Sequence, residues 1–174
     1  MQIDEKLRKA YLESHLPYRI NSLLSPDLIT HRREKATSKE QVERYSDSLI
    51  LEPSFEISIV FGRSLLAFLG ITIDSGNNLT HITPRKDDFT IKDIYPDANF
   101  CPLNDNLVIK NKQSLTTIIR VANKSVAHLT TSFANSAEQE SLASARIAIY
   151  KLMLKYVPDI NKQGIWWYTQ VESN

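Results

Sequence analysis

The stretch that decides the fold is Pro53-Ser-Phe-Glu-Ile-Ser-Ile-Val-Phe-Gly-Arg-Ser-Leu-Leu-Ala-Phe-Leu69, which is apolar on almost every side of a helix. Pro53 suits the first helical position, where its missing N–H forms no intrahelical hydrogen bond. Gly70 suits the position just after the last helical residue. A helix that is apolar all round must be covered by other helices. The stretch therefore predicts the central helix of a bundle.

Two further helices are predicted in the last third of the chain. The first runs from Ser114 to about Ala134, and its apolar residues recur at helical spacing: Leu115, Ile118, Ile119, Ala122, Val126, Leu129 and Phe133. The second begins at Ser136, which forms a capping box with Gln139, and ends near Val157. Its predicted core stripe is Leu142, Ala145, Ile149, Leu152 and Tyr156. The aromatic run Gly164-Ile-Trp-Trp-Tyr168 is expected to pack back on the bundle.

Shorter helices are predicted before the central one. The first helix runs from Asp4 to Ser14 and is stopped by Pro17, and a short piece follows from Tyr18 to Leu24. Ser38 and Gln41 form a capping box that opens a helix to about Ile50. The basic run from His31 to Lys35 is interpreted as a solvated loop, with contact to RNA as the other interpretation.

Residues 72–113 lack a sustained apolar period and are expected to be mostly loop. Within them, Thr83-Pro84 could start a short helix, and Phe89 to Ile94 fits either a helical turn or a strand. Only 4 of the 174 residues are Gly, which favours helices over a sheet with many tight turns. The predicted fold class is all-α: one domain over residues 1–174, an up-and-down bundle of four to five main helices with a long irregular middle segment.

Composition excludes several classes of protein. Lys and Arg total 21 against 20 Asp and Glu, so the net charge of +1 excludes a chain that coats nucleic acid through bulk charge. The lone Cys101 excludes an intrachain disulfide and makes a reducing, cytoplasmic location the expectation. The four His are scattered, so neither a metal site nor another cofactor is expected. The longest apolar stretch is too short and too interrupted to span a membrane.

The helix predicted from Ser114 carries the candidate chemistry. Opposite its apolar stripe lies a band of residues spaced at helical turns: Thr117, Arg120, Lys124, His128 and Thr131. No carboxylate occurs between Gln113 and Ala137, so no acidic residue four positions away neutralises these cations. One interpretation is a solvated helix face. The other is a phosphate-handling site in which His128 acts as acid or base and Arg120 and Lys124 hold the phosphate.

Arg63 is the other candidate binding residue, because it lies on the apolar central helix. A guanidinium there must reach water or a carboxylate, since an unpaired buried charge is too costly. Two interpretations remain open. Arg63 either forms an ion pair across the bundle, with Glu56 as a distant possible partner, or contacts phosphate near the band formed by Arg120 and His128.

The run Arg120-Val-Ala-Asn-Lys-Ser-Val-Ala-His128-Leu resembles the HEPN superfamily of helical domains, and its abortive-infection, phage-defence members most of all. Phe61-Gly-Arg63-Ser-Leu-Leu also resembles an early helix of that family. The resemblance covers roughly residues 38–158, with about a dozen specific residues. It implies a four- or five-helix bundle, commonly a homodimer, whose active members are metal-independent ribonucleases. Arg120 and His128 would be the catalytic residues, and Asn123 and Lys124 would be binding residues beside them. Arg63 is a candidate binding residue because of its place on the apolar helix, as a phosphate contact.

Two functions follow from the resemblance and the residues together. The first is an RNA-binding protein or metal-independent endoribonuclease related to defence or toxin–antitoxin systems. The alternative is a non-catalytic helical bundle that binds a partner protein or a nucleotide.

Overall fold

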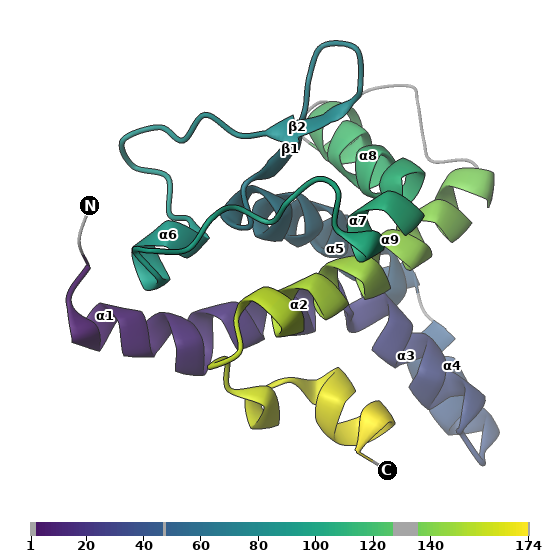
Figure 1. The fold of residues 1–174 in the computed structure, drawn as a ribbon. Helices are drawn as coiled ribbons and strands as arrows, with labels where there is room; N and C mark the ends of the chain where they lie inside the picture. Colours follow the sequence, from purple (N-terminus) through teal and green to yellow (C-terminus); the bar gives the residue numbers. More distant parts are fainter. Residues whose placement is uncertain (1–2, 47, 127–135, 174) are drawn as a thin grey trace.

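The computed structural model describes residues 3–46, 48–126 and 136–173. Most of these residues are helical, and the described part of the chain contains one small antiparallel sheet of two strands (Figure 1). The all-α class predicted from the sequence is therefore confirmed. No helix among the described residues is long and apolar enough to cross a membrane.

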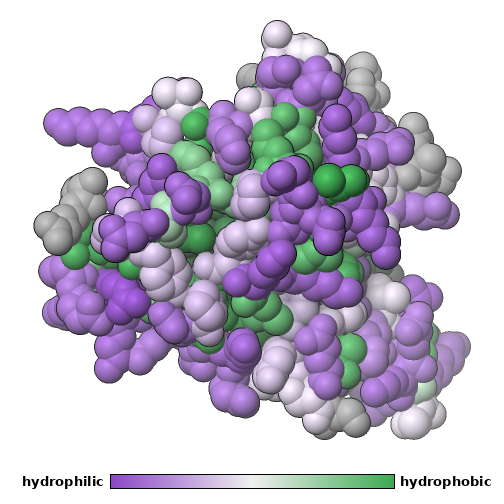
Figure 2. Space-filling model, viewed as in Figure 1, coloured by the Kyte–Doolittle hydropathy of each residue, from purple (hydrophilic) through white to green (hydrophobic). Residues whose placement is uncertain are grey.

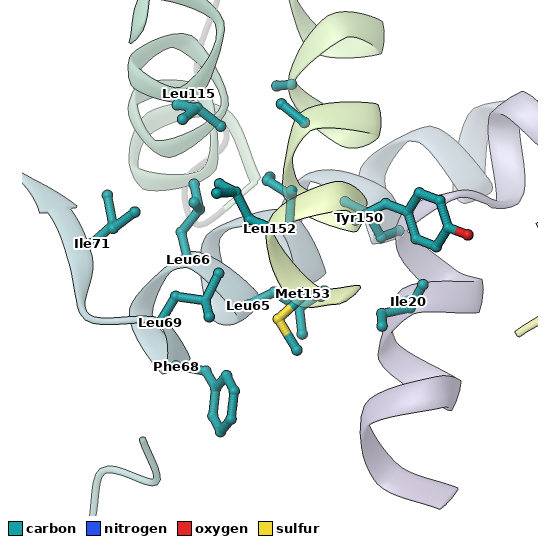
Figure 3. Packing of buried hydrophobic residues seen from close by; sticks show 14 of the residues in the cluster. Ile20, Leu65, Leu66, Phe68, Leu69, Ile71, Leu115, Tyr150, Leu152 and Met153 are labelled. Atoms are coloured by element: carbon teal, nitrogen blue, oxygen red, sulfur yellow. The ribbon is translucent and has the colours of Figure 1, made fainter. Parts of the chain in front are cut away.

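Helix α5 (Ser48–Phe68) is the centre of the bundle, as its composition predicts. It packs against α2 (Leu16–Leu23), α3 (Ser25–Glu34), α8 (Lys112–Val121) and α9 (Ser136–Tyr156). Leu65, Leu66 and Leu69 are fully buried near its end, together with Leu115 of α8 and Leu152 and Met153 of α9 (Figure 3). Gly70 has a positive φ of 86° and ends the helix as expected.

Pro53 does not begin this helix, as the sequence predicted, because α5 starts at Ser48. Pro53 lies within the second turn, on the exposed side of the helix. At that place a proline removes one intrahelical hydrogen bond, which the remaining turns can tolerate. The helix opened by Ser38 is correspondingly shorter than predicted. It is α4 (Lys39–Ser46), and the Ser38 Oγ accepts a hydrogen bond from the Gln41 N–H at 3.2 Å.

Pro17 does not stop the first helix either. Helix α1 (Glu5–Ala10) continues through a π-helical turn (Tyr11–His15) into α2, with Pro17 in the first turn of α2. A π turn and a proline leave carbonyl groups without helical donors. Asn161 satisfies two of them: its N–H donates to the Leu12 carbonyl at 3.0 Å, and its Nδ2 donates to the Glu13 carbonyl at 3.4 Å. This distant cap lets the helical path continue past Pro17.

The basic run from His31 to Lys35 was predicted to be a loop, but it forms the end of helix α3. Pro26 lies in the first turn of α3, where proline is favoured, and basic residues occupy the last turn, where they complement the helix dipole. Those terminal signals are correct for a helix. The helix was not predicted because apolar residues recur only weakly at helical spacing in this segment.

The middle segment is partly ordered into short elements. Strands β1 (Ile71–Ile73) and β2 (Leu79–His81) pair antiparallel, with Ile71 opposite His81. Asp74 closes their turn by accepting hydrogen bonds from the N–H groups of Gly76 and Asn78. Two short helices follow, α6 (Ile91–Ile94) and α7 (Asn106–Lys110). The helix considered at Thr83-Pro84 does not form, and the ambiguous segment from Phe89 to Ile94 contains α6, whose N-terminus Thr90 caps.

Helices α8 and α9 match the predicted core faces where the structure describes them, except that Tyr156 is only half-buried. The buried side chains include Leu115, Ile118, Ile119, Ala122, Leu142, Ala145, Ile149 and Leu152. Helix α8 begins at Lys112, so Ser114 does not cap it; the Ser114 Oγ instead accepts a hydrogen bond from Ser141 of α9 at 3.3 Å. A π-helical turn (Ala122–Val126) follows α8. The predicted core residues Leu129 and Phe133 lie outside the described residues.

A buried ion pair joins α9 to α3. The Arg146 side chain is only 3% exposed, and its Nε and Nη2 donate to the two carboxylate oxygens of Asp27 at 2.5 and 2.9 Å. The guanidinium also lies over the Phe55 ring of α5, 4.8 Å from the ring centroid. The bidentate ion pair and the aromatic ring compensate the buried charge, while the buried Nη1 has no hydrogen-bond partner among the described residues.

The C-terminal segment folds back on α2, as its aromatic residues suggested. The Asn21 side chain accepts a hydrogen bond from the Trp166 N–H and donates one to the Gly164 carbonyl, both at 2.8 Å. Ile165 is fully buried, whereas the Trp166 side chain is 51% exposed. The segment is therefore held by its backbone and by Ile165, and one of its three aromatic side chains remains in solvent.

The crossing of α5 and α8 depends on Gly62 and gives a stability prediction. A Cβ at position 62 would lie 2.4 Å from Cδ1 of Ile118, which is fully buried. We expect Gly62→Ala to be less destabilising in an Ile118→Val background by about 1 kcal/mol or more, because valine lacks the colliding methyl group. Urea denaturation of the four proteins of this double-mutant cycle measures the difference. The same cost of Gly62→Ala in both backgrounds would contradict it.

Candidate functional site

The candidate site is a cavity of about 580 Å³ beside the C-terminal half of α5. Its walls come from α2, α5, β1 and residues 82–90, the segment that connects β2 to α6 and passes beside α5 (Figure 1). Ligand cavities in proteins commonly measure about 300 to 1,000 Å³, so this one has room for a small organic molecule.

Three arginines from three different elements line this arginine cavity. Arg19 lies on α2, Arg63 on α5, and Arg85 on the segment between β2 and α6. Arg63 and Arg85 are exposed and Arg19 is half-buried, and none of the three forms an ion pair with a residue that the structure describes. The Arg19 Nη1 donates to the His15 carbonyl at 3.2 Å, which holds its stem along α2. The cavity rim therefore presents three guanidinium groups whose charge no described carboxylate neutralises directly.

The floor of the arginine cavity is apolar and includes aromatic rings. Buried side chains of Leu16, Leu65, Ile71 and Ile119 form part of it. Phe89 stacks on Tyr11 with ring centroids 3.7 Å apart and on Phe68 with centroids 6.1 Å apart. Figure 3 shows the Phe68 ring pointing away from Leu66 and Leu152, and Phe68 is itself a buried member of the core cluster.

Two acidic residues also lie at the rim and limit its positive charge. Asp87 and Asp88 are exposed and line the cavity beside Arg85. The Asp88 carboxylate is occupied by the backbone, because it accepts a hydrogen bond from the Arg85 N–H at 2.7 Å. It therefore shapes the turn that presents Arg85. The rim combines three positive charges with two negative ones, so it can attract an anion without forming a strongly basic surface.

The structure separates Arg63 from the other predicted site residues. Arg63 lines the arginine cavity, whereas Arg120 forms an ion pair with Glu138 of α9. The expectation that the cations of this helix lack acidic partners is therefore wrong for Arg120, since the sequence argument considered only carboxylates of the same helix. Thr117, predicted in the solvent-facing band, is buried. Asn123 and Lys124 are exposed in the π-helical turn, and His128 lies outside the described residues.

Arg19 and Arg85 were missed by sequence reasoning. Neither belongs to a motif, and each is isolated among unrelated residues in its segment. Only the fold brings them to Arg63, because α2 runs beside α5 and the hairpin returns the chain to the same side of α5. No signal in the sequence could have identified them as part of one site.

A second polar cluster lies between α7 and α9 and holds titratable groups. The Asp105 carboxylate accepts hydrogen bonds from Lys155, from Tyr156 Oη at 2.5 Å and from the Leu107 N–H at 2.8 Å. Burial alone would raise the pKa of Asp105, but these hydrogen bonds lower it overall. Burial also raises the pKa of the neighbouring Cys101 thiol to about 11, which keeps it protonated and unreactive. The cluster therefore anchors α7 to α9 rather than forming a reactive site.

Metal chemistry has no support among the described residues. They contain no group of three or more His, Cys, Asp or Glu side chains placed to hold a metal ion. The chain matches no family model, no curated protein and no solved structure.

The Asp105 cluster predicts a pH-dependent loss of stability. Because the folded-state pKa of Asp105 lies below its ordinary value of 3.8, its stabilisation is present above that pH and is lost as the pH falls through the lowered pKa. We expect Asp105→Asn to cost about 1–3 kcal/mol of unfolding free energy at pH 7 and less in acid. Denaturant titrations across pH test this, with the exposed Asp97→Asn as the control. An equal cost at all pH values would contradict the assignment.

Proposed function

We propose that this chain is a helical domain that binds a phosphate-bearing nucleotide, free or as a unit of single-stranded RNA, in the arginine cavity. The observation that carries the proposal is the convergence of Arg19, Arg63 and Arg85 on one cavity without ion pairs to described residues. A guanidinium presents paired N–H donors that match the oxygens of a phosphate, and such charge-assisted hydrogen bonds are among the strongest in proteins.

The apolar floor favours a nucleotide over a bare phosphate. Phosphate alone needs only donors and charge, whereas a nucleobase needs an apolar or aromatic surface on which to stack. The half-buried side chains of Tyr11, Ile82 and Phe89 supply that surface beside the arginines, above the buried Leu16, Ile71 and Phe68. The volume of about 580 Å³ matches one nucleotide unit rather than a folded nucleic acid. RNA would therefore enter as an unpaired strand that inserts one unit.

The overall charge is consistent with a local site of this kind. With a net charge of +1, the chain has no bulk attraction for a polyanion, so affinity must come from the few contacts in the cavity. Binding should therefore weaken only modestly as salt rises, because few phosphates are neutralised. The alternative of a protein-binding bundle makes a different prediction, since it requires no nucleotide affinity at all.

Binding measurements with three ligands test the proposal. The ligands are inorganic phosphate, adenosine monophosphate and a short single-stranded RNA of mixed sequence, followed by calorimetry or fluorescence anisotropy. Arg63→Ala and Arg85→Ala should each weaken binding about tenfold or more, as expected for loss of a charge-assisted hydrogen bond. Arg63→Lys should recover only part of the loss, because lysine keeps the charge without the paired donors.

Arg33→Ala is the matched control. Arg33 is exposed on α3, lies outside the cavity and forms no ion pair with a described residue, so it removes the same charge elsewhere. Nucleotide binding equal to RNA binding would identify the free nucleotide as the ligand, and RNA binding alone would identify the strand. No binding of any of the three, or equal losses in Arg33→Ala and Arg63→Ala, would overturn the proposal.

A ribonuclease activity, which the HEPN resemblance implies, is a separate prediction with a separate test. If His128 acts as acid or base on RNA, His128→Ala should abolish cleavage and leave RNA binding in the arginine cavity unchanged. Incubation of both proteins with RNA, with and without a chelator, measures this, and the chelator should have no effect. Equal cleavage by both proteins would exclude His128, and no cleavage by either would leave a binding domain.

A further inference from the structure

Helix α5 carries an exposed, mostly apolar stripe along its outer face. Ile50, Pro53, Ile57, Val60 and Ser64 follow one another at alternating steps of three and four residues, and all five are exposed. The side chains of Ile50, Ile57 and Val60 are 43%, 45% and 45% exposed. This spacing is that of the seam between two packed helices, because a seven-residue repeat keeps one stripe facing a partner. We call these five residues the α5 stripe.

Other exposed apolar groups gather beside the α5 stripe. Seven large hydrophobic side chains are exposed among the described residues, and five lie on this face: Tyr18, Ile50, Ile57, Val60 and Trp166. Four of them line one groove of about 550 Å³, and Val60 follows Ile57 by one turn. Figure 2 shows one face of the molecule, on which hydrophilic side chains surround hydrophobic groups. Concentration of exposed apolar side chains on one face is typical of an interaction surface.

The inner face of α5 confirms the orientation of the stripe. Phe55 contacts Arg146 of α9, and Gly62 is packed against Ile118 of α8. These two residues are seven apart and point into the domain's own core. The stripe lies on the opposite side of the helix, so the fold leaves it available to another molecule.

Charges beside the α5 stripe indicate what that molecule is. Glu56 and Arg63 are seven residues apart, so they lie on the same flank of the stripe, with the acid nearer the N-terminus. Both are exposed, and neither forms an ion pair with a described residue. In an antiparallel pair of identical helices, the same flank of each helix faces that flank of the other, in the opposite direction. The acid of one copy then lies opposite the base of the other copy. A parallel pair would not bring these charges together.

We propose that a second copy of this chain docks antiparallel on the α5 stripe. A twofold axis between Ile57 and Val60 places Ile57 of each copy against Val60 of the other. The same axis brings Glu56 of each copy to Arg63 of the other, so the ion pair occurs twice. Such an isologous contact uses one surface on both copies and closes after two chains. The partner of the stripe is therefore the chain itself.

The proposal does not rest on the proposed function, although the two share part of the surface. Val60, Arg63 and Ser64 lie at the rim of the arginine cavity as well as on or beside the α5 stripe. In the dimer, Glu56 of the other copy would therefore compete with a phosphate for the Arg63 guanidinium. Arg85 and Arg19 belong to the cavity alone, and Ile57 belongs to the stripe alone. Variants of these separate residues distinguish failure of one proposal from failure of the other.

Sedimentation equilibrium of the full chain, without ligand, tests the docking. The wild type should form a reversible dimer. Ile57→Asp should weaken it at least about tenfold, because it places a charge at the centre of the apolar seam. Ile109→Asp makes the same change at an exposed isoleucine of α7 away from the stripe, and it should leave the dimer unchanged. Both sites are exposed, so both variants should keep the wild-type circular dichroism.

Charge reversal tests the antiparallel register. Glu56→Arg and Arg63→Glu should each weaken the dimer, because each places like charges across the seam, and the double variant should restore it. Failure of the double variant to recover association would overturn the register. A wild type that is monomeric at every concentration, or an Ile57→Asp variant that dimerises as well as the wild type, would overturn the docking itself.

Discussion

The close approach of α5 to α8 at Gly62 is the constraint on which the rest of the structure depends. Without a side chain at that position, Ile118 and Leu23 come against the backbone of α5, and the helices on both sides of it can share one core. Burial of the inner face of α5 in this way determines which face of the helix remains exposed. The arginine cavity and the α5 stripe both follow from this packing, because both lie on surface that it leaves uncovered.

The helical class and the main core faces could be predicted because they depend on local patterns. Apolar spacing identified the buried residues of α8 and α9, and Gly70 marked the end of α5. Prolines were misread where a distant residue changes their cost. Pro17 is tolerated because Asn161 donates hydrogen bonds to the carbonyl groups left free near it. No residue near Pro17 in the sequence predicts that contact. The β-hairpin was missed because its strands are only three residues long.

The candidate site was less predictable than the fold, since it is assembled from separate segments. Arg63 could be singled out because a cation on an apolar helix requires an explanation, and the structure places it at a cavity. Arg19 and Arg85 reach the same cavity only through the tertiary arrangement. Arg120 illustrates the opposite error, because Glu138 lies on another helix, beyond the reach of an argument based on spacing within one helix. Charge balance is a property of the folded surface.

The pair formed by Arg146 and Asp27 also has a kinetic consequence. Its two residues are 119 positions apart in the chain, so the contact closes a long loop between α3 and α9. Loop closure of that length is entropically costly, and such contacts tend to form late, after local helices have gathered. An interaction made after the transition state slows unfolding and has little effect on the rate of folding. We therefore expect the buried ion pair to slow unfolding more than it speeds folding.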